Sequence, residues 1–163
     1  MAYDFFGIPV SELNVWLIWI LPFAAAMIIP AVGKFSKLTT GRVAVAFAAM
    51  SAISAATLFP MALGAHEIHH QIMWIDAIGL KAGVLADPLS VIMSNVVGWI
   101  SFLIMCYSTG YMKGDKDITR FWFWMMFFIG SMQLIILSDN LLQVFFGWEA
   151  VSYTHLTLPT TSP

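Results

Sequence analysis

The sequence predicts an all-α membrane protein. We expect a polytopic transmembrane helix bundle with four complete spans, the start of a fifth, and a short interfacial hairpin between spans 2 and 3. Hydrophobic residues make up 60% of the 163 residues and charged residues only 10%, whereas soluble domains average about 25% charged residues. Several uncharged apolar runs are also long enough to cross a bilayer core of about 30 Å.

Composition also excludes several classes of function. The net charge is −2 and the sequence has no basic stripe, which argues against a nucleic-acid partner and leaves the lipid bilayer as the surroundings. A single cysteine, Cys106, excludes an internal disulfide and a multi-cysteine iron–sulfur or metal site. No G-x-G-x-x-G segment is present, so nothing indicates a dinucleotide-binding loop.

The apolar runs give the expected spans. We expect them over residues 15–32, 43–63, 89–109 and 121–138, with a fifth helix beginning at about residue 140. In the second run, alanines recur every three or four residues, a spacing that lets helices approach closely: Ala44, Ala48, Ala52 and Ala55. The fourth run begins with the aromatic segment Phe121–Trp124, which suits an interfacial belt.

Basic residues in the short connections set the expected orientation. They are Lys34, Lys37 and Arg42 after the first run, and Lys113, Lys116 and Arg120 after the third. Because lysine and arginine favour the cytoplasmic side, we expect both connections inside and the amino terminus outside. Residues 1–14 carry no positive charge, so we expect no cleaved signal peptide, and the first apolar run should be retained as an anchor.

The longest connection, Gly64–Asp87, should lie on the outer face. Its apolar residues are separated by Gly79 and Gly83, which predicts short extended segments or a hairpin at the interface. Asp87 and Pro88 then form a helix N-terminus signal, because an acidic residue stabilises the first turn and proline fits the first helical position. Within the spans, Asn95 and Gln133 are expected to be interhelical hydrogen-bond partners or, less commonly, to line a water-filled path.

A short histidine cluster in this connection matches H-E-x-x-H literally. On a helix, His66 and His70 would share one face and could bind zinc, with Glu67 as general base. The context is poor, because the motif follows the end of a span and precedes the expected hairpin. An exposed interfacial cluster of His66, His69 and His70 is the favoured interpretation, and no metal site is assigned.

Glu149 is the candidate functional residue. Asp139 or Asn140 is a suitable N-cap for the fifth helix, which places Glu149 roughly 14 Å deep at 1.5 Å per residue. A charge at the centre of a membrane helix costs roughly 2.5–3.5 kcal/mol on insertion scales, so an acidic residue there indicates function. Desolvation favours the neutral form of a carboxyl group, and a nearby cation favours its charged form. A buried carboxyl group near a mobile cation can therefore change its protonation, as a proton relay requires. The alternative is a permanently neutral carboxyl group, or one paired with a lysine for assembly.

The character of the sequence changes at Ser152. The last residues, 152–163, are rich in threonine and proline, and the preceding helix-forming run is too short to cross a bilayer. We therefore expect residues 1–151 to form one region and residues 152–163 to be a non-native or disordered tail, such as a cloning or adaptor read-through.

Five segments together resemble a known family, in order and at fitting intervals: Asp87–Ser90, Tyr107–Met112, Arg120–Phe121, Leu137–Leu142 and Phe146–Glu149. From about residue 13 to residue 149 the chain resembles the N-terminal part of the antiporter-like chain-5 (L-type) subunit of respiratory complex I, the proton-pumping NADH:quinone oxidoreductase. Subunits of Mrp-type cation/proton antiporters and of deazaflavin-linked dehydrogenases share the pattern. After Glu149 the sequence departs from it, which supports a foreign tail.

The resemblance implies a membrane-arm subunit that couples electron transfer elsewhere in the complex to proton pumping. It implies that Glu149 is a proton relay paired with a lysine on a later helix, which this sequence lacks, so the chain alone is expected to be inactive. It further implies no cofactor in this subunit, other membrane-arm subunits as partners, and a multi-pass location in an energy-transducing membrane (the cell membrane in a prokaryote). A sodium/proton antiporter subunit without redox activity is the alternative.

Overall fold

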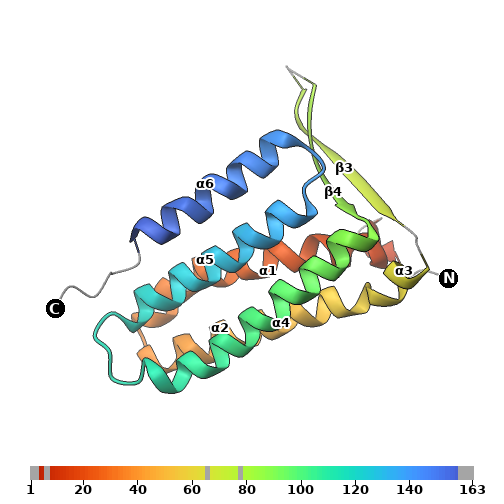
Figure 1. Ribbon diagram of the computed structural model, residues 1–163. Coiled ribbons are helices and arrows are strands. Elements are labelled where there is room, and N and C mark those ends of the chain that lie inside the picture. Colours follow the sequence, from red (N-terminus) through yellow and green to blue (C-terminus); the bar gives the residue numbers. More distant parts are fainter. Residues whose placement is uncertain (1–3, 6–7, 65–66, 77–78, 158–163) are drawn as a thin grey trace.

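The computed structural model describes residues 4–5, 8–64, 67–76 and 79–157. In this part of the chain, four helical segments are long and apolar enough to cross a membrane: Glu12–Gly33, Thr39–Leu63, Pro88–Tyr111 and Ile118–Leu137. They lie side by side as an elongated bundle (Figure 1). The predicted fold class, a helical membrane protein with four complete spans, is therefore confirmed.

The long helices are α1 (Val10–Gly33), α2 (Lys37–Thr57), α4 (Pro88–Tyr111) and α5 (Ile118–Leu137). A short helix, α3 (Phe59–Leu63), directly continues α2. Helix α1 packs against both α2 and α5, and α4 covers the other side of α2. Helix α1 runs through Pro22 and Pro30, which a membrane helix tolerates because neighbouring groups satisfy the freed backbone atoms.

The long connection forms the predicted hairpin. Strand β3 (Ile68–Ile75) pairs antiparallel with β4 (Leu80–Ala86), in a register that places His69 opposite Leu85. The hairpin projects from the end of the bundle where α1 begins and α4 starts (Figure 1). A second, very short pair, β1 (Asp4–Phe5) and β2 (Ile8–Pro9), precedes α1.

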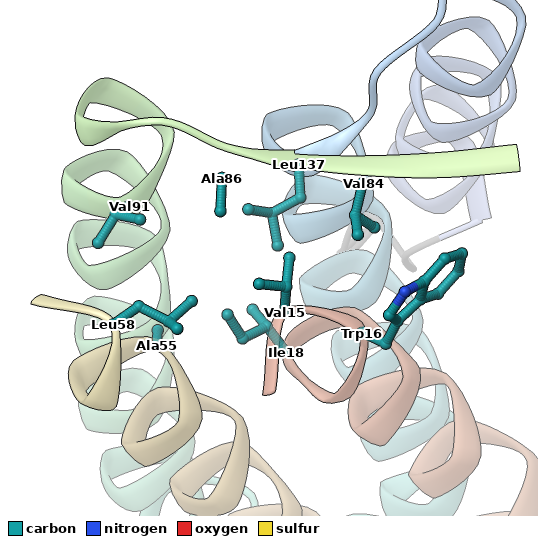
Figure 2. Packing of buried hydrophobic residues seen from close by; sticks show 9 residues of the cluster. All are labelled: Val15, Trp16, Ile18, Ala55, Leu58, Val84, Ala86, Val91 and Leu137. Carbon is teal, nitrogen blue, oxygen red and sulfur yellow. The ribbon is translucent and has the colours of Figure 1, made fainter. Parts of the chain in front are cut away.

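One part of the core lies beneath the hairpin. Val84 and Ala86 point from β4 toward Val15 of α1 and Leu137 at the end of α5, and all four are fully buried (Figure 2). Val84 also forms an isolated antiparallel bridge with Ser138. The hairpin is thus attached to the bundle through β4, directly above the point where α5 ends.

The second part of the core lies deeper in the bundle, where α2 meets α1, α4 and α5. The predicted close-packing face of α2 is confirmed, because its four alanines are almost completely buried: Ala44, Ala48, Ala52 and Ala55. Trp122 of α5 is also fully buried in this core. The expectation that Trp122 belongs to an exposed aromatic belt is therefore wrong, because its ring faces the neighbouring helices instead of the outside.

Helix α4 begins as Asp87 and Pro88 predict. The Asp87 carboxylate accepts a hydrogen bond from the Ser90 backbone N–H (2.7 Å), and the Ser90 hydroxyl accepts one from the Asp87 N–H (2.8 Å). This reciprocal capping box satisfies backbone donors that have no partner within the helix. Hydrogen bonds from the side chain and then the backbone of Ser90 outweigh burial and lower the pKa of Asp87.

Candidate functional site

Helix α6 (Leu141–Thr157) carries the candidate residue Glu149 and lies alongside α5 on the outside of the bundle (Figure 1). Of the two predicted N-cap residues, Asn140 provides the cap, because its Oδ1 accepts a hydrogen bond from the Gln143 backbone N–H (2.9 Å). The helix continues past Ser152 to Thr157. The foreign origin of residues 152–163 stays a prediction.

Two positions on α6, two residues apart, face opposite ways. Gly147 is buried against α5, where an added Cβ would lie 2.7 Å from Ile135 Cγ1 and 3.3 Å from the Ser131 carbonyl oxygen. Because each residue of an α-helix turns by about 100°, Glu149 points roughly 200° away from Gly147. Glu149 is accordingly exposed on the side of α6 that faces away from α5.

The outward side of α6 is apolar apart from Glu149. Exposed members include Phe145 (55% exposed) and Trp148 (62%). Within the described residues, Glu149 makes neither an ion pair nor a hydrogen bond. A carboxyl group set in an exposed aromatic and aliphatic helix face is chemically suited to a partner that brings both apolar cover and a cation.

The turn between α5 and α6 is held by the hairpin. The Asp139 carboxylate accepts hydrogen bonds from the Gln71 amide (2.6 Å) and lies 3.1 Å from His69 Nε2, and both partners are on β3. On β4, the Gly83 backbone N–H donates to Gln143 Oε1 (3.2 Å), and the Lys81 carbonyl accepts from the Asn140 amide (3.1 Å). The start of α6 is therefore fixed to both strands.

The electrostatics of this turn favour a charged Asp139. Burial of its side chain, which is only 3% exposed, raises the carboxyl pKa, but hydrogen bonds from Gln71, His69 and Asn140 outweigh burial. The positive charge of a protonated His69 acts in the same direction, so the net effect is a pKa below the usual 3.8. Asp139 thus presents a carboxylate to the hairpin.

Residues 73–122, which run from β3 through α4 into α5, match the family described as NADH-Ubiquinone oxidoreductase (complex I), chain 5 N-terminus. The chain is 36% identical over 140 residues to NADH-quinone oxidoreductase subunit L of Rickettsia bellii, covering 83% of this chain and 22% of that protein. It is 34% identical over 146 residues to the chloroplastic NAD(P)H-quinone oxidoreductase subunit 5 of Spinacia oleracea, covering 83% of this chain and 20% of that protein.

The chain belongs to the complex I chain 5 family. It corresponds to the N-terminal region of that family and spans about a fifth of the length of the curated relatives it matches. The Asp-Pro-Leu-Ser segment that suggested the chain 5 resemblance lies within the matched residues, at the start of α4.

In this chain 5 member, polar residues within the spans form hydrogen bonds between helices, as predicted. Gln133 is fully buried, its Oε1 accepts from the Ser94 hydroxyl (2.7 Å), and its Nε2 donates to the Ser94 carbonyl (3.0 Å). The Asn95 amide donates to the Ala55 carbonyl of α2 (2.9 Å). Gln133 therefore joins α5 to α4, and Asn95 joins α4 to α2.

The histidine segment does not have the conformation that H-E-x-x-H zinc chemistry needs. Ile68, His69 and His70 lie in strand β3, whereas that motif places its two histidines on one helix face. His66 lies outside the described residues. The other two histidines have separate partners: His69 faces Asp139, while His70 Nε2 lies 3.5 Å from Glu12 and its Nδ1 accepts from the Trp16 indole N–H (3.1 Å).

The contacts of Asp139 with the hairpin are the part of the site that sequence reasoning missed. The sequence indicated Asp139 only as a cap for the following helix. A hairpin following a span and an acidic turn after a later span are both visible in the sequence, but nothing in it gives their register. The pairing of Asp139 with His69 and Gln71 depends on how α5 packs against α1.

Proposed function

We propose that this chain provides the first helices of a membrane-arm proton-translocating subunit of a complex I-like quinone oxidoreductase, coupling electron transfer elsewhere in the complex to proton pumping. The similarity to quinone oxidoreductase subunits L and 5 supports this assignment. In this proposal the activity belongs to the whole assembly, the partners are other membrane-arm subunits, and this subunit binds no cofactor.

The single observation that carries the proposal is the position of Glu149. It lies on the side of α6 facing away from α5, within an exposed apolar face, and without a cation among the described residues. A carboxyl group in an apolar environment favours its neutral form, and an approaching cation favours its charged form. A lysine on a later helix that moves toward or away from Glu149 would therefore make it release or take up a proton.

Such a relay works against the membrane potential. Moving one elementary charge across 100 mV requires about 2.3 kcal/mol. Anchoring α6 is useful for this purpose, because Gly147 holds the helix close to α5 while the turn at Asp139 is tied to the hairpin. The cation can then move relative to a fixed carboxyl group.

We further propose a multi-pass location in an energy-transducing membrane, with the amino terminus and the hairpin outside. The two basic connections lie at the same end of the bundle, as the hydrogen bond from Lys37 Nζ to the Lys116 carbonyl (2.9 Å) indicates. Lysine and arginine concentrated at one end favour the cytoplasmic side for that end. The hairpin lies at the opposite end (Figure 1).

The test is Glu149→Gln in the full-length subunit within its assembled complex. The amide keeps the size of the side chain and removes its ability to exchange a proton, so proton pumping should fall while assembly, followed by native gel electrophoresis, stays intact. Glu67→Gln is the matched control, because Glu67 is exposed and lies outside the spans. Wild-type proton pumping in the Glu149 variant would contradict the proposed relay mechanism.

Proton transport by vesicles that contain the assembled complex discriminates the alternative, a sodium/proton antiporter subunit without redox activity. Proton movement that requires an electron donor and a quinone supports the complex I-like assignment. Proton movement driven by a sodium gradient alone, with no electron donor, would support the antiporter instead.

A further inference from the structure

A hollow of about 960 Å³ opens at the end of the bundle opposite the hairpin. It is bounded by the start of α2, the end of α4 and the connection that leads into α5. Its walls include four basic side chains and one acidic side chain: Lys37, Arg42, Lys113, Lys116 and Asp115. Since four positive charges face one negative charge, the lining carries a net charge of +3.

The charges of this hollow are not neutralised within the described chain. The structure contains no ion pair to Arg42, Lys113 or Lys116 from any residue it describes. The one carboxylate, Asp115, accepts a hydrogen bond from the Asp117 backbone N–H (2.7 Å). The ammonium group of Lys37 bonds to a neutral carbonyl, that of Lys116. An anionic ligand therefore has several cations available.

A buried donor without an acceptor also lines the hollow. Trp122 is fully buried, and its Nε1 has no hydrogen-bond partner among the described residues. The indole lies against Gly41, where an added Cβ would come within 3.3 Å of Nε1. Buried polar groups in proteins are normally hydrogen-bonded, so the unused N–H points to an acceptor supplied by a ligand.

The rest of the lining is apolar. Val45, Ala46 and Ile118 contribute to the walls. Both α2 and α4 are long enough to span a membrane, so the hollow lies where the ends of spans meet a basic connection. A ligand for this site must combine an anionic, oxygen-rich head with a hydrocarbon part.

We propose that this hollow is a binding site for an anionic phospholipid. The phosphate oxygens bond to the guanidinium of Arg42, the ammonium groups of Lys113 and Lys116, and the Trp122 indole N–H. The acyl chains leave along Val45 and Ala46 toward the bilayer. Basic pockets between membrane helices are a recognised means of holding such headgroups, and a planar guanidinium suits phosphate.

The test measures lipid retained by the purified chain in a neutral detergent, using native mass spectrometry with phosphatidylglycerol or phosphatidylcholine added. The wild-type chain should retain phosphatidylglycerol preferentially. Arg42→Gln together with Lys113→Gln should weaken that retention roughly twenty-fivefold, since each basic residue near an anionic headgroup contributes about fivefold. Trp122→Phe, which retains an aromatic ring and removes the donor, should also weaken it.

Lys34→Gln is the matched control, because Lys34 is an exposed lysine at the same end of the bundle but does not line the hollow. It should retain phosphatidylglycerol like the wild type. Equal retention of both lipids, or unchanged retention in the Arg42/Lys113 variant, would overturn the proposal. Full displacement of phosphatidylglycerol by inorganic phosphate at equal concentration would also overturn it, because the site would then hold a free anion.

Discussion

The Gln71 amide donates a 2.6 Å hydrogen bond to the Asp139 carboxylate, across 68 positions of sequence. This contact joins the first strand of the hairpin to the turn that precedes α6. His69, next but one along the strand, lies against the same carboxylate oxygen. Helix α6, which carries Glu149, is thus positioned by side chains that lie about 70 residues earlier in the sequence.

The pH dependence of stability should follow from Asp139. Because its pKa in the folded chain lies below 3.8, the charged form stabilises the fold at any pH above that value. This stabilisation should be lost as the pH falls below about 3.8 and Asp139 becomes protonated. Asp139→Asn should lower the thermal midpoint in detergent at neutral pH. It should also make the decrease of the midpoint below pH 4 smaller than in the wild type. The matched control Asp76→Asn, at an exposed position, should keep the wild-type decline.

Gly83 should not tolerate a side chain. An added Cβ there would overlap the Asp139 carboxylate, while a Cβ at Gly110 would meet nothing within 4 Å. Gly83→Ala should therefore displace the turn from the hairpin and increase amide hydrogen exchange at the start of α6. Gly110→Ala is the control and should leave exchange there unchanged. Equal exchange in the two variants would show that Gly83 does not hold this contact.

Removal of the α4 cap should have a moderate effect. Asp87→Ala deletes the acceptor for the Ser90 N–H and should destabilise the chain by about 1 kcal/mol, as is typical for N-caps. Asp117, the N-cap of α5, makes no side-chain capping bond. Asp117→Ala should therefore cost much less in the same denaturation experiment, and equal losses would contradict the role assigned to the Asp87 carboxylate.

The bond between Gln133 and Ser94 should contribute measurably to the packing of α4 on α5. Gln133→Leu replaces the amide with an apolar side chain of similar size and removes both hydrogen bonds to Ser94. Such interhelical bonds in membranes average about 0.6 kcal/mol and reach roughly 1.7 kcal/mol. A double-mutant cycle with Ser94→Ala, read by unfolding in detergent, should return a coupling energy in this range. A coupling near zero would mean that the two side chains stabilise the chain independently.

The sequence was most informative where a single local property decides structure. Uncharged apolar runs are sufficient to identify spans because lipid requires every backbone group to be bonded within its own segment. Asp87 and Pro88 marked the start of α4 because capping involves only neighbouring residues. The alanine spacing of α2 identified its buried face for the same reason, since a helix repeats its faces at a fixed interval.

Tertiary packing decided what the sequence left open. Trp122 and Trp124 are similar in sequence context, yet Trp122 is fully buried and Trp124 is only partly so. Which of them faces a neighbouring helix depends on the rotation of α5, which Phe121–Trp124 alone do not determine. The exposure of Glu149 likewise depends on Gly147 turning its own side of α6 toward α5.

The attachment of Asp139 to the hairpin has a consequence for biosynthesis. Strands β3 and β4 are neighbours in sequence and are translated before α5, so they can pair with each other before Asp139 leaves the ribosome. The turn at Asp139 can then bind to a hairpin that has already formed. The start of α6 can therefore take its place as soon as it has been made, and Glu149 is then oriented by elements that precede it in the sequence.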